Sequence, residues 1–516
     1  MDKVYQLVPV MKAFLLFLLA AQCYVPLWAA ISVNTAWEVR PTVGASTNGG
    51  GFVQLATGTD TSIFDNKNAA ACGSCQSATI NISTTDAVAV GTTTITSLTA
   101  NFSAAIVGNI VYFTGGTGAI AAVRRQVVTF TNSTTIVLDA SIAASTGMTM
   151  NIGGALDDIA TALLANTAGN IIFVKATGTL SRTASLTLNN SVTPAVGAPP
   201  NQIIGYTTTR TDNGRATIQL STNAGLVALN AASVTGWYFR NLIVDCNSLG
   251  TSKGIAVITT SVIHNVTVKN CTSIGIQNAF DGPDVLIVDS EVTGCTSACS
   301  AAISIESSAG SAVIRCYVHD NVSSGIIATS GRRMRVIDNL VTNNTGATSV
   351  GITLASGAGS IIMGNTVFAS GSDGILNSNQ MLTGASVRNN ILVNNAGWGL
   401  SNGITAGAAA FPQFDGNAFF NNTLGTRRSM DDTGSTNPIN AAAPYTNVLD
   451  VILTASPFTN PAGGDFTLNN TAGGGALLRG TGTPGPLLGI SQTGSMDFGP
   501  LQSAAAAATG TATRAG

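Results

Sequence analysis

The sequence predicts an all-β fold in which short strands stack into a solenoid. A pattern of apolar and small polar residues recurs every 23–27 residues between Val234 and Asn422, and a period of this length is typical of stacked repeats. The apolar runs are rich in Val and Ile and too short for helices, so we interpret them as strands. Stacked coils about 4.8 Å apart would pair their backbones and share one continuous core.

Aligned columns define the repeat. The reference column contains Asn241, Val266, Ser290, Cys316, Asn339, Asn365, Asn390 and Asn417. Apolar residues stand three positions before and two positions after this column, and in the first coil these are Tyr238 and Ile243. A second column follows five positions later, with Cys246, Cys271, Cys295, Asn321, Asn344, Ser370, Asn395 and Asn422. We assign it to coil corners, where Asn tolerates left-handed dihedral angles.

Glycines such as Gly325 and Gly351 precede the next apolar residue, and we interpret them as bends before the following strand. These strings together resemble the right-handed parallel β-helix repeats of the pectate-lyase-like superfamily over residues 170–497. The resemblance implies that fold and an exported or phage-type structural protein. Because the same fold carries lyases, hydrolases, adhesins and phage tailspikes, it does not by itself select a function.

The first thirty residues predict an export signal. A short apolar run at 13–21 is followed by small residues at the end of segment 1–30, as in a signal peptide. Met11 is an alternative start, and a retained N-terminal anchor is an alternative to cleavage. A lipoprotein at Cys23 is disfavoured, because a Gln precedes this residue where a small side chain is needed.

Two further parts precede the solenoid. Residues 31–84 resemble the segment that precedes β-helices in exported bacterial and phage proteins. Residues 85–153 alternate like strands, which predicts a small antiparallel β-module, either a barrel or a sandwich. A helix over 156–165 has an apolar stripe that includes Leu164, and two Asp residues in its first turn. We expect this one helix to cap the first coil of the solenoid, which begins at Ile171.

The β-helix is predicted to span residues 154–430. Residues 431–502 form a closing region, and the Ala-, Thr- and Gly-rich run 503–516 is predicted to be a disordered tail.

Composition excludes some partners. Charged residues make up only 9% of the chain, and the formal net charge is −2, so nothing attracts nucleic acid electrostatically. No run of eighteen apolar residues follows residue 30, so no membrane span is expected after removal of the signal. The oligomeric state is not indicated.

Cysteine spacing indicates one local disulfide and one column of stacked cysteines. Cys72 and Cys75 have CxxC spacing, for which a local disulfide is favoured over a redox pair or half a zinc site. Cys246, Cys271 and Cys295 fall in one column. They are interpreted as stacked small side chains, with a Cys246–Cys271 disulfide as the alternative.

Charge is concentrated in one part of the repeat. The repeat register stacks Asp289, Arg315 and Asp338 on successive coils, and a loop supplies three Arg residues. The candidate ligand-binding residues are Asp289, Arg315, His319, Asp320, Arg332, Arg333, Arg335 and Asp338, with Glu291 nearby. The alternatives are a surface charge ladder for the column and a solvated loop for the arginines.

We therefore expect an exported protein, secreted or at the cell surface, with a virion component as the alternative. The predicted role is structural or adhesive, through a surface that binds a polysaccharide or a surface protein. The alternative is a polysaccharide lyase or glycoside hydrolase acting on an acidic polysaccharide. No catalytic motif is present and no cofactor or metal site is predicted, although carboxylates could share a calcium ion with an acidic glycan.

Overall fold

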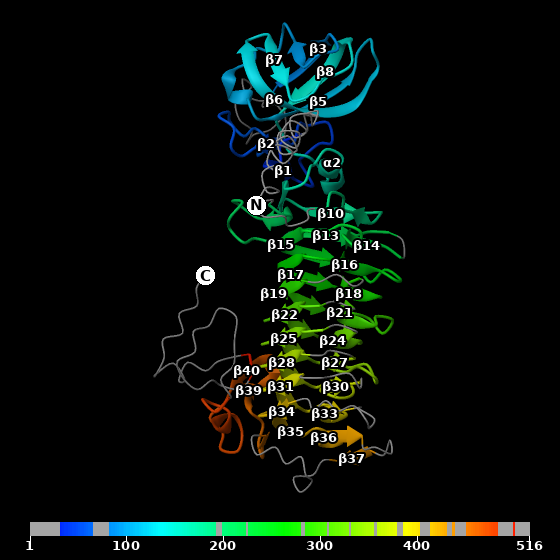
Figure 1. Cartoon of the computed structure of the whole chain (residues 1–516), viewed down its shortest axis with the longest axis vertical. Coiled ribbons are helices and arrows are strands. Elements are labelled where there is room, and N and C mark those ends of the chain that lie inside the picture. The colour runs from blue at the N-terminus through cyan, green and yellow to red at the C-terminus, as the bar shows by residue number, and fades with distance from the viewer. Residues whose placement is uncertain are drawn as a thin grey trace, which may run out of the picture.

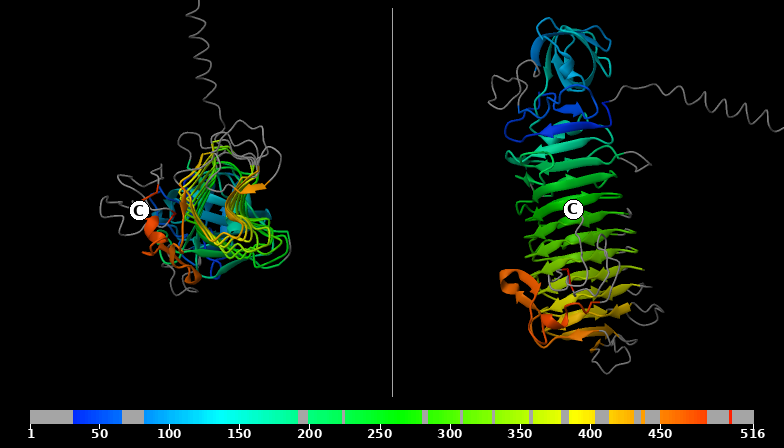
Figure 2. Two further views of the ribbon diagram at one scale, coloured as in Figure 1. Left: turned by 90° about the horizontal axis from the view of Figure 1, so that it is seen from below. Right: turned by 90° about the vertical axis from the view of Figure 1, so that its left-hand side faces the viewer.

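The computed structural model describes residues 31–65, 82–191, 199–222, 225–279, 284–306, 309–329, 332–355, 359–378, 385–402, 413–430, 436–438, 450–482 and 499–500. A small barrel stands at one end of a long stack of coils, and a short C-terminal hairpin lies against the side of the other end (Figure 1). Viewed along the long axis, successive coils superimpose on one another (Figure 2).

The barrel forms the small N-terminal β-module. Its strands pair antiparallel in the order β3-β4-β7-β6-β5-β8 and close on themselves. Their bounds are β3 (Ile82–Ala89), β4 (Thr94–Thr96), β5 (Ile110–Gly115), β6 (Ile120–Asn132), β7 (Thr135–Leu138) and β8 (Ser145–Ile152), with a 3₁₀ turn at Ala104–Ile106. Alternating side chains such as Ile95, Phe113 and Met150 fill a core of its own.

Three strand positions recur in each coil and stack into parallel sheets. Sheet 1 contains β1 (Thr35–Val39), β9 (Ile171–Lys175), β12 (Asn201–Tyr206), β15 (Trp237–Asp245), β17 (Val262–Lys269), β19 (Leu286–Val288), β22 (Ala312–Ile314), β25 (Arg335–Ile337), β28 (Ile361–Met363), β31 (Ser386–Arg388) and β34 (Gln413–Asp415). A short strand, β2 (Gly51–Val53), pairs antiparallel with β1.

Sheet 2 lies beyond the first corner of each coil. It contains β10 (Thr179–Arg182), β13 (Ala216–Leu220), the second halves of β15 and β17, β20 (Glu291–Thr293), β23 (Tyr317–His319), β26 (Leu340–Thr342), β29 (Thr366–Phe368), β32 (Ile391–Val393), β35 (Ala418–Phe420) and β38 (Val451–Ile452).

Sheet 3 closes each coil. It contains β11 (Leu186–Thr187), β14 (Val227–Asn230), β16 (Lys253–Val257), β18 (Ile274–Asn278), β21 (Ala301–Glu306), β24 (Ser324–Thr329), β27 (Ile352–Leu354), β30 (Ile375–Asn377), β33 (Trp398–Asn402) and β36 (Gly425–Met430), with β37 (Thr436–Pro438) added antiparallel at its end. The predicted parallel β-helix is therefore confirmed, and its core is one continuous apolar cluster that the three sheets enclose.

In the coils from β17 to β35, two left-handed residues bend the chain, one on each side of sheet 2. The first column of positive φ angles is Asn241, Asn265, Asp289, Arg315, Asp338, Gly364, Asn389 and Gly416. The second is Asn270, Gly294, Asp320, Asn343, Ala369, Asn394 and Asn421. Asn, Asp and Gly dominate both columns because they adopt this conformation at low cost.

The expected position of the left-handed residues was wrong by one. The predicted corner column, with Asn344 and Asn395, follows the left-handed residue and points inward, where its amides bond from coil to coil. In this column Asn321 Nδ2 donates to Asn344 Oδ1 at 2.9 Å. In the reference column Asn339 Nδ2 donates to Asn365 Oδ1 at 2.9 Å, and Asn365 Nδ2 donates to Asn390 Oδ1 at the same distance. Both Asn columns are therefore internal hydrogen-bond ladders beside the bends.

Gly325 and Gly351, expected at bends, lie next to or inside strands without positive φ. A Cβ on Gly325 would approach the carbonyl oxygen of Gly351 to 2.5 Å. These glycines are therefore needed for close backbone packing.

The register of the first aligned coil was also wrong by one residue. Phe239, not Tyr238, pairs with Ile263, and Val244, not Ile243, pairs with Val268. A slip of one residue exchanges the two faces of a strand, so Phe239 is fully buried and Tyr238 faces outward. The later coils keep the predicted register: Val318, Val341 and Val367, for example, stack in order.

The N-terminal end of the stack differs from the expectation. The solenoid does not begin at Ile171, because β1 of the N-terminal segment pairs parallel with β9. The helix α2 covers only Ile159–Leu163, capped by the Asp158 side chain. Leu164, placed on its apolar stripe, is 85% exposed.

Glu38 of β1 carries a buried carboxylate. It accepts hydrogen bonds from Arg40 and Tyr206 and pairs with Arg210. Arg210 lies in the loop after β12, so its ion pair with Glu38 joins that loop to the first strand. Arg210 also pairs with Asp60 at 3.0 Å.

The C-terminal hairpin covers part of sheet 2. Its strands β39 (Phe458–Asn460) and β40 (Asp465–Leu468) are followed by a 3₁₀ turn at Gly475–Leu477, and another 3₁₀ turn, Pro461–Gly463, joins them. Phe458 and Phe466 pack edge-to-face on Phe368 of β29.

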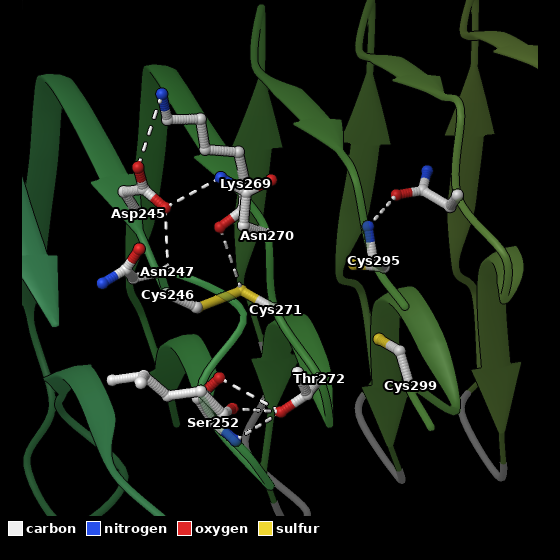
Figure 3. Close-up of a disulfide and its surroundings, with 12 residues drawn as sticks. Asp245, Cys246, Asn247, Ser252, Lys269, Asn270, Cys271, Thr272, Cys295 and Cys299 are labelled. Atoms are coloured by element: carbon white, nitrogen blue, oxygen red, sulfur yellow. Dashed lines mark hydrogen bonds and ion pairs between the residues drawn. A yellow bond between two sulfur atoms is a disulfide. The ribbon is translucent and has the colours of Figure 1, made fainter. Parts of the chain in front are cut away.

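Cys246 and Cys271 form a disulfide between neighbouring coils, with a Cα–Cα distance of 4.9 Å (Figure 3). This was the alternative reading of that cysteine column. The pair Cys72 and Cys75 lies outside the described residues, as do segments 1–30 and 503–516.

Candidate functional site

The outer face of sheet 2 changes character along the stack. From β26 onward its outward residues are mostly apolar, including Leu340, Ile391 and Phe420, and the C-terminal hairpin packs against them. In the earlier coils the outward residues are mostly polar. We call them the polar face: Thr217, Gln219, Asp245, Thr267, Lys269, Glu291, Thr293, Tyr317 and His319, with Ile243 among them.

His319 is held at both ring nitrogens in the middle of the polar face. Its Nε2 lies 3.0 Å from Oε1 of Glu291 on the preceding coil, and its Nδ1 lies 2.7 Å from Oδ2 of Asp320. Tyr317, two residues earlier on the same strand, stacks on the imidazole with a centroid distance of 3.8 Å. The ring orientation is therefore fixed by three neighbours from two coils.

The two carboxylates make His319 easier to protonate. Burial lowers the pKa of His319, but its hydrogen bonds and charge interactions with Glu291 and Asp320 outweigh this effect, so the pKa is raised above its usual value. The pKa of Glu291 is lowered, mainly by the hydrogen bond from His319. The two carboxylates therefore favour the imidazolium form of His319 over the neutral imidazole.

Further polar contacts extend this cluster along the stack. Thr267 donates to Glu291 Oε2 at 2.8 Å, and Arg215 lies 3.9 Å from the same oxygen. In the neighbouring row of the same face, Lys269 Nζ lies 3.4 Å from Oδ2 of Asp245. The charged groups of the polar face are thus paired with one another.

The predicted charge ladder forms at the corner between sheets 1 and 2. Arg315 binds Asp289 with two hydrogen bonds of 2.7 and 2.8 Å. On the preceding coil, Nε2 of His264 lies 3.5 Å from Oδ2 of Asp289. Nδ1 of His264 forms a 3.0 Å hydrogen bond with the hydroxyl group of Tyr238. Both partners of the Arg315–Asp289 pair are about one third exposed, so it stabilises the fold by only about 0–1 kcal/mol.

Asp338 continues this column but is less solvated. Burial raises the pKa of Asp338 to about 7, and the Arg315 guanidinium opposes the rise. The carboxyl group is therefore partly protonated at neutral pH.

The three loop arginines do not join either cluster. Arg332 and Arg333 lie before β25, at the opposite end of the sheet 1 strands from Asp338, and Arg335 begins that strand. All three are exposed, and within the described residues none forms an ion pair or side-chain hydrogen bond with the other predicted site residues. The predicted site thus divides into the His319 cluster, the corner ladder and a separate Arg loop.

Several residues of the polar face were missed by the sequence reasoning. Tyr317, Thr267 and Arg215 were not singled out, although Tyr317 and His319 alternate around the buried Val318 and this pattern places both outward. Arg215 could not be found this way, because it reaches Glu291 from three coils away. Its contact depends on the length of the side chain.

No group of three or more His, Cys, Asp or Glu side chains among the described residues is arranged to hold a metal ion. The carboxylates of Glu291 and Asp320 approach opposite edges of one imidazole. In the part of the chain that the structure describes, no helix is long and apolar enough to cross a membrane.

Comparison with known proteins agrees with this architecture. A family model described as a right-handed β-helix region matches residues 253–419, which extend from β16 to β35. The protein is a right-handed parallel β-helix. No curated protein matches the chain by sequence.

Solved structures with a similar arrangement are distant in sequence. Pectate lyase Pel9A is 17% identical, with a TM-score of 0.47, over 67% of this chain and 91% of its own. The periplasmic alginate epimerase AlgG is 15% identical, with a TM-score of 0.30, over 51% of this chain and 76% of its own. ORF18 of Geobacillus virus E2 is 13% identical, with a TM-score of 0.29, over 51% of this chain and 53% of its own. These likenesses assign no activity to this chain.

Proposed function

We propose that the protein is exported and binds a polysaccharide along the polar face of sheet 2, in an adhesive or structural role. The observation that carries this proposal is the division of the sheet's outer face. The later coils present apolar residues to a covering hairpin, whereas the earlier coils present hydrogen-bonding groups.

The pairing of charges favours a ligand rich in hydroxyl groups. Glu291 is occupied by His319 and Thr267, and Asp245 is paired with Lys269. Fixed, mutually neutralised side chains offer hydrogen-bond donors and acceptors to a sugar without presenting a large net charge. We therefore favour a neutral polysaccharide over an acidic one at this face.

The spacing of the side chains on the polar face also suits a chain of sugars. Strands recur at about 4.8 Å along the stack, so equivalent side chains form a regular row. The stacked pair Tyr317 and His319 adds an aromatic surface to this row, and aromatic faces pack well against sugar rings.

Binding of the full chain to a glycan array with neutral and acidic polysaccharides tests the proposal. Tyr317→Ala should weaken binding to the best ligand about tenfold, the loss expected when a stacking contact of about 1.4 kcal/mol disappears. Tyr238→Ala is the matched control, because Tyr238 also stacks on a histidine, His264, but belongs to sheet 1.

Equal weakening by the two tyrosine substitutions would contradict a site on sheet 2. A triple substitution of Arg332, Arg333 and Arg335 by Ala should leave binding to neutral glycans unchanged. If that variant alone lost binding, the ligand would be acidic and the Arg loop would be the site.

A second candidate function is glycan cleavage at the same face. The observation that favours it is the placement of His319 between two carboxylates with a raised pKa, because a held imidazolium can donate a proton to a leaving oxygen. Incubation with neutral and uronate polysaccharides, followed by assays for reducing ends and unsaturated products, tests it. Cleavage that survives in His319→Gln would remove this residue from the reaction.

A further inference from the structure

We propose that Cys295 and Cys299 form a second disulfide bond, one coil beyond the Cys246–Cys271 bond. Both are free thiols in the described structure, and both are buried. Their side chains are within hydrogen-bond reach of each other. Figure 3 shows both side chains on the coil next to the existing disulfide.

A tight turn brings the two thiols together. The Cys299 amide donates to the Thr296 carbonyl at 3.0 Å, and the Thr296 amide donates to the carbonyl of Cys271 on the previous coil at 3.0 Å. The turn is thus fixed to the disulfide-bonded coil at one end. Ser297 and Ala298 at its tip are exposed, so the turn that carries Cys299 lies at the surface of the solenoid.

Cys316 provides an internal contrast. It is also a buried free thiol, but its sulfur donates to the backbone carbonyls of Ile287 and Ile314, and no contact with another thiol is found for it among the described residues. The same oxidant therefore has no second sulfur to join to Cys316.

The reaction requires a two-electron oxidant, for which we name a small-molecule disulfide such as oxidised glutathione. The hydrogen bond from Cys295 lowers the pKa of the Cys299 thiol, so Cys299 loses its proton and attacks one sulfur of the reagent. One reagent thiolate leaves and takes up that proton. Cys295 then loses its own proton and displaces the second reagent thiolate, which is protonated in turn, so two protein thiols become one disulfide and the reagent becomes two thiols.

The bond would join the strand that carries Glu291 to the connection leading into sheet 3. Because the closed loop is short, the chain-entropy model gives a smaller stabilisation than for the 25-residue separation of Cys246 and Cys271. Its main effect is chemical, because oxidation removes two buried thiols from the core of the solenoid. An oxidising exterior would favour this state.

Mass spectrometry of the full chain tests the proposal. The purified protein is treated with oxidised glutathione and then denatured without reductant in the presence of iodoacetamide, which alkylates free thiols. The alkylated protein is then digested. Cys316 should be alkylated, whereas Cys295 and Cys299 should become alkylated only after reduction. Alkylation of both without reduction, a lasting glutathione adduct on Cys299, or a bond from Cys295 to Cys271 would each overturn the proposal.

Two variants sharpen the result. Cys299→Ser should restore alkylation of Cys295, and Cys316→Ser should leave the Cys295–Cys299 bond intact. If Cys299→Ser does not fold, the wild-type measurement still decides. If the Cys299→Ser variant folds and Cys295 still resists alkylation after denaturation, another partner is bonded to Cys295. That result would contradict the assignment.

Discussion

Nε2 of His319 lies 3.0 Å from Oε1 of Glu291, although 28 residues separate them in the chain. Stacking one coil on the next creates this contact, because β23 pairs with β20 and places the two outward rows side by side. The charge state of this pair therefore affects how strongly the two neighbouring coils are held together.

The first prediction concerns His319. Its pKa is raised in the folded state, so the stabilisation it provides is fully present below its unfolded pKa of about 6.5 and is lost as pH rises through the folded pKa. His319→Gln should therefore lower the free energy of unfolding by on the order of 1 kcal/mol at about pH 6, and by less at about pH 9. Denaturant unfolding at the two pH values measures this. A larger loss at about pH 9 would contradict the assigned charge state.

The second prediction concerns Asp338, whose ionised form destabilises the folded state, whereas the charged form of His319 stabilises it. Its pKa is raised by burial to about 7, so ionisation becomes more costly in the folded state as pH rises from the unfolded pKa of about 3.9 towards 7. Asp338→Asn keeps a residue that accepts positive φ and removes the charge. The variant should gain melting temperature relative to wild type at about pH 8 and little at about pH 4. An equal gain at both values would show that the backbone, not the charge, is responsible.

The sequence could predict the stack because its signal is repeated. Val318, Val341 and Val367 recur at nearly constant spacing, so each coil confirms the register of the next. The first coil lacked this support at its start, where Trp237, Tyr238 and Phe239 are three adjacent aromatic residues. Either face could then be the buried one, and the choice of Tyr238 was wrong.

The candidate site was harder to predict, since its contacts depend on side-chain reach. Asp289 and Arg315 were found because they share a column on adjacent coils. The contribution of β1 to the solenoid was missed because Glu38 meets Tyr206 and Arg210 across more than 160 residues, with the barrel inserted between them. No local sequence pattern indicates a contact between residues so far apart in the chain.

The third prediction tests the internal amide ladder. Asn365 accepts from the Asn339 backbone and side chain, and donates to Asn390 and to the Val336 carbonyl. Asn365→Ala removes all four of these buried hydrogen bonds, including the one that the Asn339 backbone N–H donates, and should cost about 2–4 kcal/mol. Asn422→Ala is the matched control, because Asn422 bonds to Asn395 in the same way but is partly exposed, so water can replace its bonds. Equal costs would contradict the role of burial.

The fourth prediction tests the core register. Val341 is fully buried between neighbouring coils, so Val341→Asp would bury an unpaired charge and should cost about 4 kcal/mol or more, enough to prevent stable folding. Val322→Asp is the control, because Val322 is 43% exposed and its replacement should be nearly neutral. Thermal melting of both variants gives the comparison. An unchanged melting temperature for Val341→Asp would refute the register.

The last prediction concerns the N-terminal end of the solenoid. Deletion of residues 1–166 removes β1 and α2 and exposes the backbone edge of β9, because β1 pairs with that strand over Ile171 to Val174. An unpaired strand edge is a template for association with another chain. The truncated protein should therefore form concentration-dependent aggregates in light scattering.

A second deletion separates the cap from the barrel. Ile82 and Ile152 are paired neighbours at the two ends of the barrel, so residues 83–151 can be replaced by a short linker that leaves β1 and α2 in the chain. If β1 and α2 are the cap, this protein should remain dispersed at concentrations where the longer deletion aggregates. Aggregation of both proteins would assign the protection to the barrel, and a dispersed 1–166 deletion would show that β9 needs no cover.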